Sequence, residues 1–299
     1  MRTLLYVNPK AGQGKPLKYL KGVLAGVQDD NPDFEVILAE NKDSGLKQLK
    51  NLTGGGARVL CLGGDGTVHD VARICIEQNL PLGIIPAGSG DDIAHSLGIQ
   101  TPRTEHGYQQ LLEAFLKPSV REQSITTGKV TFPSGSFHYV LGVMSSGFDA
   151  HCNAIANTLK VRGPVRYVLA MLIGLRSFKP VNMAISVDSV ESKRNIMMMA
   201  IGNGPSYGSG MKVVPQADPF APSLSAIIVN RCSKPTFLRI FPKVFKGTHV
   251  QHELVESFTF SHLRVEIASS EPIFGDGEFF DYGTFEIQAA PDSLRVILP

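Results

Sequence analysis

Hydrophobic positions in the first 120 residues follow two alternating periods. Short apolar runs, of the kind found in buried strands, occupy residues 3–7, 34–38, 58–62 and 82–85. Between and after them, apolar residues recur every three or four positions and predict helices over residues 17–27, 46–52, 68–77 and 104–116. Strands and helices alternating at this spacing imply right-handed crossovers. We therefore expect a parallel sheet with helices on both faces.

The pattern changes after about residue 120. Strand-like runs separated by hairpin-length turns occupy residues 137–143, 181–187, 195–201, 224–229, 258–260 and 263–267. Helical patterns interrupt them at residues 150–160, 164–176 and 235–246. The sequence thus predicts an α/β chain of two domains, a mostly parallel one in residues 1–125 and a mainly antiparallel β domain in residues 126–287.

The most informative polar stretch is Gly63-Gly64-Asp65-Gly66-Thr67, which lies between a predicted strand and a predicted helix. Glycines let the backbone turn sharply and approach a ligand, and the amides at the start of the helix can bind phosphate oxygens. Asp65 is unexpected there, because a carboxylate repels phosphate unless a divalent cation or a transferable proton comes between them. Its presence suggests chemistry on a phosphate.

Two further glycine-bearing loops follow neighbouring strands. Residues 8–15 lack the spacing of a Walker A loop, and a plain strand-to-helix turn explains them equally well. Residues 85–94 carry Ser89, Asp91 and Asp92 before a short helix, and alone they would be explained as a helix N-cap. Because ligands of parallel sheets bind at the carboxyl ends of the strands, the three loops together predict a phosphate site.

Near the C-terminus, Gly275-Asp276-Gly277-Glu278 places two carboxylates between apolar residues. Asp-Gly is a strong hairpin signal, so a plain β-turn is one interpretation. The other concerns Glu278, which has Phe274 before it and Phe279 after it. We expect such neighbours to desolvate the carboxylate partly, which raises a carboxyl pKa and favours proton acceptance.

Composition excludes some partners. The 29 Lys and Arg against 27 Asp and Glu give a formal charge of +2, far from the basic balance of nucleic-acid-binding proteins. Four cysteines without a Cys-x-x-Cys pair indicate neither a zinc site nor a disulfide framework and fit a reducing cytoplasm. The longest apolar run, Val168 to Leu175, is too short to span a bilayer, so we expect peripheral membrane contact. Segments 164–179 and 237–246 could face lipid headgroups, although core helices with solvated flanks are the simpler interpretation.

Taken together, these motifs resemble the diacylglycerol kinase catalytic-domain family, bacterial lipid kinases related to sphingosine kinases. The loop with Asn8 and Gly12 resembles the first nucleotide loop of the family, residues 63–67 its signature, and residues 86–94 its P-x-G-T-G-N-D-F-A stretch. Further motifs follow in the family's order at residues 147–150, 203–211 and 275–278. The resemblance covers nearly the whole chain.

The resemblance implies a kinase with a phosphofructokinase-like α/β domain that binds ATP and Mg²⁺ and a β-rich domain that binds a lipid at the membrane surface, such as diacylglycerol or a sphingoid lipid. Residues 288–299 would return to the first domain as a strand. Glu278 would be the general base on the lipid hydroxyl, with Asp65 and Asp276 as further catalytic residues. The nucleotide and its metal would be held by Asn8, Gly12, Gly63, Gly64, Asp65, Gly66, Thr67, Gly88, Ser89 and Asp92.

Three features of the sequence depart from the family pattern. Ser89 replaces a Thr and keeps the hydroxyl, whereas Asp91 replaces an Asn and adds a negative charge close to the expected phosphates. The family's Asp-Gly-x-Leu stretch often holds a structural Mg²⁺, but here Ala221-Pro222 stand in place of Asp-Gly. Asp218 is then the remaining candidate ligand of that metal.

Two other functions stay open. A kinase of NAD or of a sugar phosphate in the same superfamily also uses Gly-Gly-Asp-Gly, although Asp91-Asp92 and the surrounding stretch speak against an NAD kinase. The weakened metal site around Asp218 suggests a non-catalytic lipid or nucleotide sensor.

Overall fold

The computed structural model describes residues 2–24, 27, 32–52, 56–161, 164–208 and 210–299, and for residues 164–168 it describes the backbone alone. The chain divides into two compact units, Met1–Thr126 with Pro291–Pro299 and Thr127–Ala290. We call the first the α/β unit and the second the β unit. The boundaries expected from the sequence, after residues 125 and 287, lie one and three residues from these.

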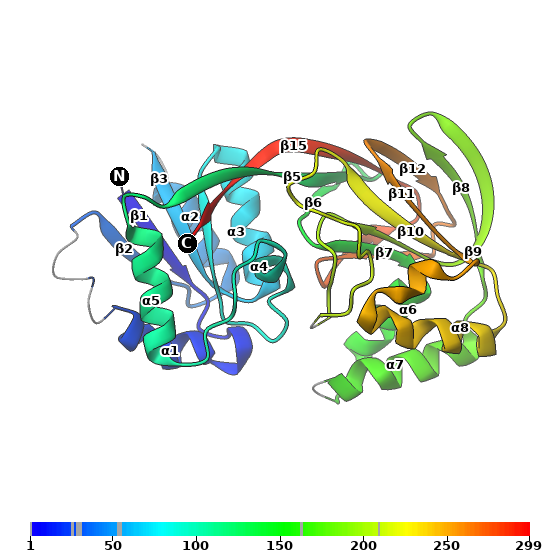
Figure 1. Cartoon of the computed structure of the whole chain (residues 1–299), viewed down its shortest axis with the longest axis horizontal. Coiled ribbons are helices and arrows are strands. Elements are labelled where there is room, and N and C mark those ends of the chain that lie inside the picture. Colours follow the sequence, from blue (N-terminus) through cyan, green and yellow to red (C-terminus); the bar gives the residue numbers. More distant parts are fainter. Residues whose placement is uncertain (1, 25–26, 28–31, 53–55, 162–163, 209) are drawn as a thin grey trace. The chain divides into compact units, whose positions relative to one another are not determined.

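The α/β unit has a parallel sheet with the strand order β2-β1-β3-β4 (Figure 1). The strands are β1 (Arg2–Val7), β2 (Phe34–Leu38), β3 (Ala57–Gly63) and β4 (Leu82–Pro86). The last part of β15 (Phe285–Leu298) adds a further parallel strand beside β4, where Val296 pairs with Leu82. Residues 293–298 therefore return to this unit, as the family resemblance implied.

Helices cover both faces of this sheet. They are α1 (Lys15–Leu24), α2 (Lys42–Leu52), α3 (Asp65–Gln78), α4 (Asp92–Ser96) and α5 (Glu105–Leu116), with a 3-10 turn η1 (Ala11–Gln13). On one face α1 packs against α5, where Tyr19 stacks on Tyr108 with ring centroids 4.6 Å apart. On the other face α2 lies against α3, and Lys42 pairs with Asp70 at 2.9 Å. Right-handed crossovers produce this division.

The β unit is built from antiparallel strands in the order β14-β13-β7-β9-β8-β12-β15, with β10 pairing β9 and β11. Its strands are the last part of β5 (Arg121–Thr131), then β6 (Phe137–Val140), β7 (Val143–Gly147), β8 (Val181–Val187), β9 (Val190–Gly202), β10 (Leu224–Asn230), β11 (Val255–Phe260), β12 (His262–Glu266), β13 (Pro272–Gly275), β14 (Glu278–Tyr282) and the start of β15. The predicted fold class, parallel in one part and antiparallel in the other, is confirmed.

Short helices pack on the β unit: α6 (Phe148–Thr158), α7 (Pro164–Ser177), α8 (Lys234–Ile240), η2 (Phe241–Lys246) and η3 (Thr248–Gln251). Phe148 of α6 packs against the neighbouring segments: its ring centroid lies 5.2 Å from that of Phe178 and 4.9 Å from that of Phe237. Among the described residues, no helix is long and apolar enough to cross a membrane.

The helix predicted over residues 235–246 changes character in its middle. It is α-helical to Ile240 and then forms the 3-10 turns of η2. The physical reason is Pro242, which has no amide hydrogen to donate to the preceding turn. The helical pattern predicted over residues 235–246 is confirmed, with a change from α-helix to 3-10 helix at Phe241.

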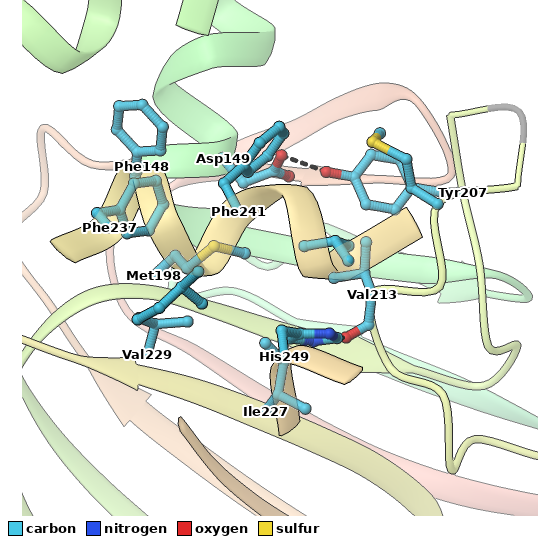
Figure 2. Close-up of a pocket in the computed structure, with 13 residues that line it drawn as sticks. Phe148, Asp149, Met198, Tyr207, Val213, Ile227, Val229, Phe237, Phe241 and His249 are labelled. Carbon is cyan, nitrogen blue, oxygen red and sulfur yellow. Dashed lines mark hydrogen bonds between the residues drawn. The ribbon is translucent and has the colours of Figure 1, made fainter. Parts of the chain in front are cut away.

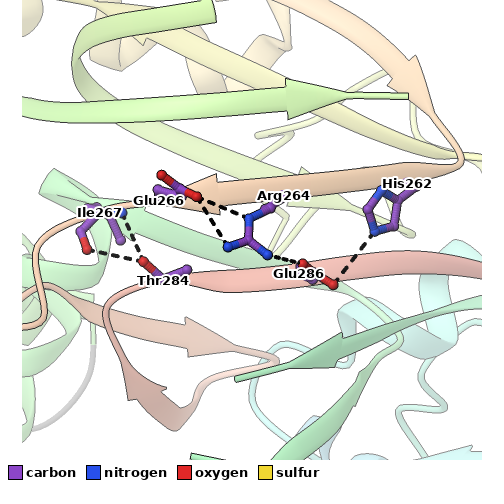
Figure 3. Close-up of polar contacts among 6 residues, drawn as sticks. All are labelled: His262, Arg264, Glu266, Ile267, Thr284 and Glu286. Carbon is purple, nitrogen blue, oxygen red and sulfur yellow. Dashed lines mark hydrogen bonds and ion pairs between the residues drawn. The ribbon is translucent and has the colours of Figure 1, made fainter. Parts of the chain in front are cut away.

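On the outer surface of the β unit, β12 and β15 are joined by ion pairs as well as by backbone hydrogen bonds (Figure 3). The Arg264 guanidinium bonds Glu286, its direct partner across the two strands, and also Glu266 at 3.2 Å. Thr284 donates to the Ile267 carbonyl at 3.4 Å beside them. Cross-strand pairs of this kind fix register more than they add stability.

Candidate functional site

The carboxyl ends of three neighbouring strands bring three loops of the α/β unit together. Val7 of β1 pairs with Leu62 of β3, and Gly63 of β3 pairs with Pro86 of β4. The chain therefore leaves the three strands at one edge of the sheet. The loops that the sequence predicts for phosphate begin side by side there.

Hydrogen bonds join these loops directly. The Ala87 amide donates to the Gly63 carbonyl at 2.8 Å. The side-chain amide of Asn8 donates to the Thr67 hydroxyl at 2.8 Å, and the Lys15 ammonium donates to the Gly88 carbonyl at 3.0 Å. Every loop is thus bonded to another, which fixes the arrangement of their backbone atoms.

Two contacts explain why the loops contain glycine. Gly12 has a φ of +50°, and a Cβ on it would lie 2.1 Å from the carbonyl oxygen of Ala87. A Cβ on Gly64 would lie 2.9 Å from the Cα atom of Gly88. Because backbone atoms are the neighbours in both places, a side chain would push the loops apart. Glycine therefore permits the close approach of the three loops.

Asp65 is the first residue of α3, where the helix N-terminus favours negative charge. Its Oδ1 accepts a hydrogen bond from the Ile93 amide at 3.0 Å. Burial raises the pKa of the Asp65 carboxyl to about 6; the Ile93 amide opposes this, and the charges of Asp92 and Asp91 add to it. Magnesium prefers oxygen ligands, and a divalent cation would stabilise a carboxylate in this environment. The residues present therefore fit a metal-bound phosphate.

Asp91 stands where the family pattern has Asn, and its side chain points back into its own loop. Its φ of +56° is a left-handed conformation that Asn and Asp tolerate better than most residues. Its carboxylate accepts hydrogen bonds from the Gly88 amide at 2.7 Å and from the Thr101 hydroxyl at 2.9 Å. Burial raises the pKa of this carboxyl. The added charge is thus buried within the loop, while Asp92 is buried at the start of α4 and Ser89 is exposed.

The β unit contains an apolar pocket (Figure 2). The empty space among its lining side chains measures about 450 Å³, including the solvent at its mouth. The lining residues are Phe148, Asp149, Met198, Tyr207, Met211, Val213, Ile227, Val229, Phe237, Ile240, Phe241, Val244 and His249. Ten of these thirteen are apolar, a lining that suits a hydrocarbon chain better than a charged group.

Three polar side chains interrupt this lining. The Tyr207 hydroxyl donates to Oδ1 of Asp149, as Figure 2 shows, and Asn153 donates to the other oxygen at 3.3 Å. His249 is buried, with Nε2 2.9 Å from the Val213 carbonyl and Nδ1 without a hydrogen-bond partner among the described residues. Burial lowers the pKa of this imidazole, so it is neutral and carries its proton on Nε2. Nδ1 is then a hydrogen-bond acceptor in an otherwise apolar pocket.

Asp276 and Gly277 form the two-residue turn between β13 and β14, with φ of +52° and +83°. The hairpin interpretation of Asp-Gly is confirmed. The Asp276 carboxylate is buried and accepts hydrogen bonds from the amides of Leu141 and Gly142 at 2.9 and 2.8 Å. These two residues interrupt the strand predicted over 137–143, which is in fact β6 and β7. The prediction is confirmed over residues 137–140 and at Val143, and the interruption falls where a distant carboxylate engages the amides of Leu141 and Gly142.

Glu278 is exposed at the start of β14, directly after the turn. Phe279 beside it is 43% exposed, and its ring packs against buried Phe274 with centroids 5.6 Å apart. The partial desolvation expected from neighbouring phenylalanines is therefore not seen, because the turn end of the hairpin lies outside the packed core. The role of Glu278 as a base stays a prediction.

Asp218 lies exposed in the connection between β9 and β10. Its Oδ1 accepts a hydrogen bond from the Phe220 amide at 2.9 Å and closes a local turn. Within the described ranges, no group of three or more His, Cys, Asp and Glu side chains is arranged to hold a metal ion. Metal binding at Asp218 stays a prediction from the family resemblance.

Comparison with known proteins identifies the family. Residues 2–123 match the family model of the diacylglycerol kinase catalytic domain, and residues 142–298 match that of the YegS C-terminal NAD kinase beta sandwich-like domain. The chain belongs to the diacylglycerol kinase catalytic-domain family. The resemblance stated from its motifs is thereby confirmed.

Relatives from bacteria match this chain over most of their length. A diacylglycerol kinase of Mycobacterium tuberculosis (strain ATCC 25618 / H37Rv) is 28% identical over 295 residues, which cover 98% of this chain and 93% of the relative. A diacylglycerol kinase of Bacillus subtilis (strain 168) is 22% identical over 245 residues, 81% of this chain and 77% of the relative. The crystal structure of a diacylglycerol kinase from Bacillus anthracis str. Sterne has the same fold, with a TM-score of 0.72 at 16% identity over 100% of this chain and 97% of that one.

Sequence reasoning missed the polar residues of the pocket. Asp149 and Tyr207 lie within two motifs, residues 147–150 and 203–211, that the diacylglycerol kinase resemblance placed in order without a role. That order was the available signal. For His249 no signal existed, because its backbone partner Val213 lies 36 positions away in the chain.

Proposed function

We propose that this chain transfers a phosphoryl group from ATP to the hydroxyl group of a lipid. The observation that carries the proposal is the set of three bonded loops at the carboxyl edge of the parallel sheet, with the partly buried Asp65 among them. Membership of the diacylglycerol kinase family and the apolar pocket of the β unit support it.

In the α/β unit, the backbone amides at the start of α3 would bind phosphate oxygens. The Ile93 amide orients the Asp65 carboxylate, and the bond from Asn8 to Thr67 holds the first two loops together. Asp65 would hold Mg²⁺, which when bound neutralises charge on the phosphates. Because phosphoryl transfer proceeds through a loose transition state, positioning and charge neutralisation are the main contributions required of these residues.

In the β unit, the apolar pocket would hold a hydrocarbon chain of the lipid. The hydrogen-bonded pair of Tyr207 and Asp149 and the free lone pair of His249 Nδ1 would orient polar groups of the same molecule. Glu278 would accept the proton of the attacking hydroxyl. In a loose transition state the hydroxyl loses its proton late, so an exposed carboxylate suffices and its desolvation is not required.

The test is an acceptor panel. The full chain is incubated with γ-labelled ATP and Mg²⁺ and with diacylglycerol, sphingosine, ceramide, undecaprenol, NAD or fructose 6-phosphate in separate reactions. We expect label in one or more of the lipids and none in NAD or the sugar phosphate. Label in NAD or fructose 6-phosphate alone would assign the chain to the other kinases of the superfamily. ATP binding without transfer to any acceptor would favour the sensor.

A further inference from the structure

Basic residues are concentrated in two segments of the β unit. Residues 159–180 and 231–248 contain ten of the 29 Lys and Arg of the chain and no Asp or Glu. The rest of the chain holds 19 Lys and Arg against all 27 Asp and Glu and is therefore net acidic. The near-neutral total charge of +2 conceals this separation.

The same segments expose large apolar side chains. Leu172 and Ile173 on α7 are 54% and 49% exposed. Leu238 on α8 is 41% exposed and Phe245 on η2 is 58% exposed. Single exposed apolar residues are ordinary, but these four lie on helices that are adjacent in the fold.

The adjacency follows from a hydrogen bond at the start of α8. The Lys234 ammonium donates to the carbonyl of Arg176, near the end of α7, at 2.6 Å. Figure 1 shows α7 and α8 on the same side of the β unit. We call the exposed side of α7, α8 and η2 the helical edge.

Exposed basic and apolar side chains lie next to one another along this edge. On α7, exposed Arg176 lies three and four positions after Ile173 and Leu172 and therefore shares their face. In the second segment, Leu238 lies on α8 and Phe245 on η2, which follows α8 directly. The exposed basic residues beside them are Arg239, Lys243 and Lys246.

We infer that the helical edge docks on an anionic lipid bilayer. Apolar side chains bordered by Lys and Arg are the pattern of interfacial helices, in which the apolar groups enter the acyl boundary and the cations meet lipid phosphates. A second copy of the chain is a poor partner, because a symmetric contact would bring the two basic surfaces together.

This inference rests on the proposed function and adds the route of the substrate. The inner sides of α8 and η2 carry buried Phe237 and Val244 and half-buried Phe241, which line the apolar pocket. The exposed sides of the same helices carry Leu238 and Phe245. One helical layer thus has the bilayer on its outer face and the pocket on its inner face, so a lipid needs to pass only this layer.

Vesicle sedimentation tests the docking without requiring turnover. The full chain is spun with vesicles of pure phosphatidylcholine and with equimolar phosphatidylcholine and phosphatidylglycerol, at low and high salt. We expect binding to the anionic vesicles, weakened by salt. Arg239→Gln with Lys243→Gln should lower the partition coefficient about 25-fold, since each basic residue near an anionic surface contributes roughly a factor of five. Leu172→Ser with Phe245→Ser should lower it about tenfold.

The β8–β9 hairpin provides matched controls. Val190→Ser removes an apolar side chain that is 73% exposed, and Lys193→Gln removes an exposed charge; both should bind vesicles as the parent does. Thermal melts check that all variants fold. Equal binding to neutral and anionic vesicles, or parent-like binding by both double variants, would overturn the inference. A dimer lost in the same variants would also overturn it and assign the edge to a second copy.

The outcome can be separated from that of the proposed function. If the chain binds anionic vesicles but phosphorylates no lipid, the docking inference stands and the proposed kinase function is wrong. If the kinase is correct, the double variants should phosphorylate soluble dioctanoylglycerol at the parent's rate and lose activity only on lipid in vesicles. If the double variants keep full activity on lipid in vesicles, the docking inference is wrong and the proposed kinase function stands.

Discussion

The candidate sites of the two units are built in opposite ways. In the α/β unit, backbone atoms of three loops approach so closely that glycine is required at Gly12 and Gly64, and hydrogen bonds hold every loop. In the β unit, apolar side chains from many elements surround a pocket with only three polar residues. The first construction leaves little room for change, whereas apolar residues of a pocket can be exchanged for others of similar size. We therefore expect the phosphate chemistry to be fixed and the choice of lipid to be adjustable.

Replacing Asp65 by Asn should have the largest effect, and it tests whether the loops of the α/β unit tolerate little change. Asn keeps an oxygen that accepts the Ile93 hydrogen bond but removes the charge that would hold Mg²⁺. We expect lipid phosphorylation, measured as initial rates with labelled ATP, to fall by about 10³-fold.

The control is Asp70→Asn on the same helix, where the carboxylate pairs with Lys42 at 2.9 Å on the surface. It should keep activity within about twofold. Equal losses in the two variants would show that a carboxylate on α3 matters only for folding.

The second prediction concerns proton transfer from the β unit. Glu278→Gln should lower kcat by roughly 10²-fold. Because Glu278 is exposed, the fold and the affinity for ATP should not change. Rates and ATP binding by calorimetry are compared with Glu191→Gln, an exposed carboxylate on β9, which should behave as the parent. Retained turnover in Glu278→Gln would remove it as the base.

The third prediction tests the pocket of the β unit with the substitution Tyr207→Phe. The substitution removes the hydroxyl that donates to Asp149 and leaves the ring in the pocket lining. If this pair orients the lipid, KM for the lipid should rise by about tenfold, which corresponds to one hydrogen bond to a charged group. KM for ATP should stay constant. Tyr282→Phe, at a tyrosine that is 54% exposed, is the matched control. A change in KM for ATP instead would contradict the separation of the two sites.

The same difference explains what could be predicted from the sequence. The loops around Asn8, Asp65 and Ser89 could be found because each follows a buried strand and a phosphate site needs glycine and polar residues at close spacing. The parallel register of the strands then brings these loops together. The local sequence pattern and the arrangement of the strands therefore both place the three loops at this edge of the sheet.

The pocket could not be predicted, because apolar residues that line a cavity look the same in sequence as those of a core. Met198 and Ile227 lie on β9 and β10 within ordinary buried strands. The role of Asp276 was equally hidden, since the Leu141 amide that it binds lies 135 positions away. Pairing across such distances is set by the antiparallel topology and leaves no local signal.

The smallest expected effect concerns stability and pH. Burial raises the pKa of Asp65 from its ordinary 3.8 to about 6, so between these values the folded chain holds a proton that the unfolded chain has lost. The free energy of unfolding therefore decreases as pH rises through this window, and the full cost is present above about pH 6. Asp65→Asn should remove this cost and melt a few degrees above the parent at pH 7.5, since a shift of this size is worth at most about 3 kcal/mol before solvent screening. At pH 4 the two should melt together. Burial also raises the pKa of Asp91, which both proteins retain, so the difference between their melting temperatures across pH reports the Asp65 carboxyl together with its electrostatic effect on this neighbour. A variant that melts below the parent at pH 7.5 would show that the carboxylate is stabilised in the loops by a bound cation, and repeating the melts with a chelator present would then restore the expected order.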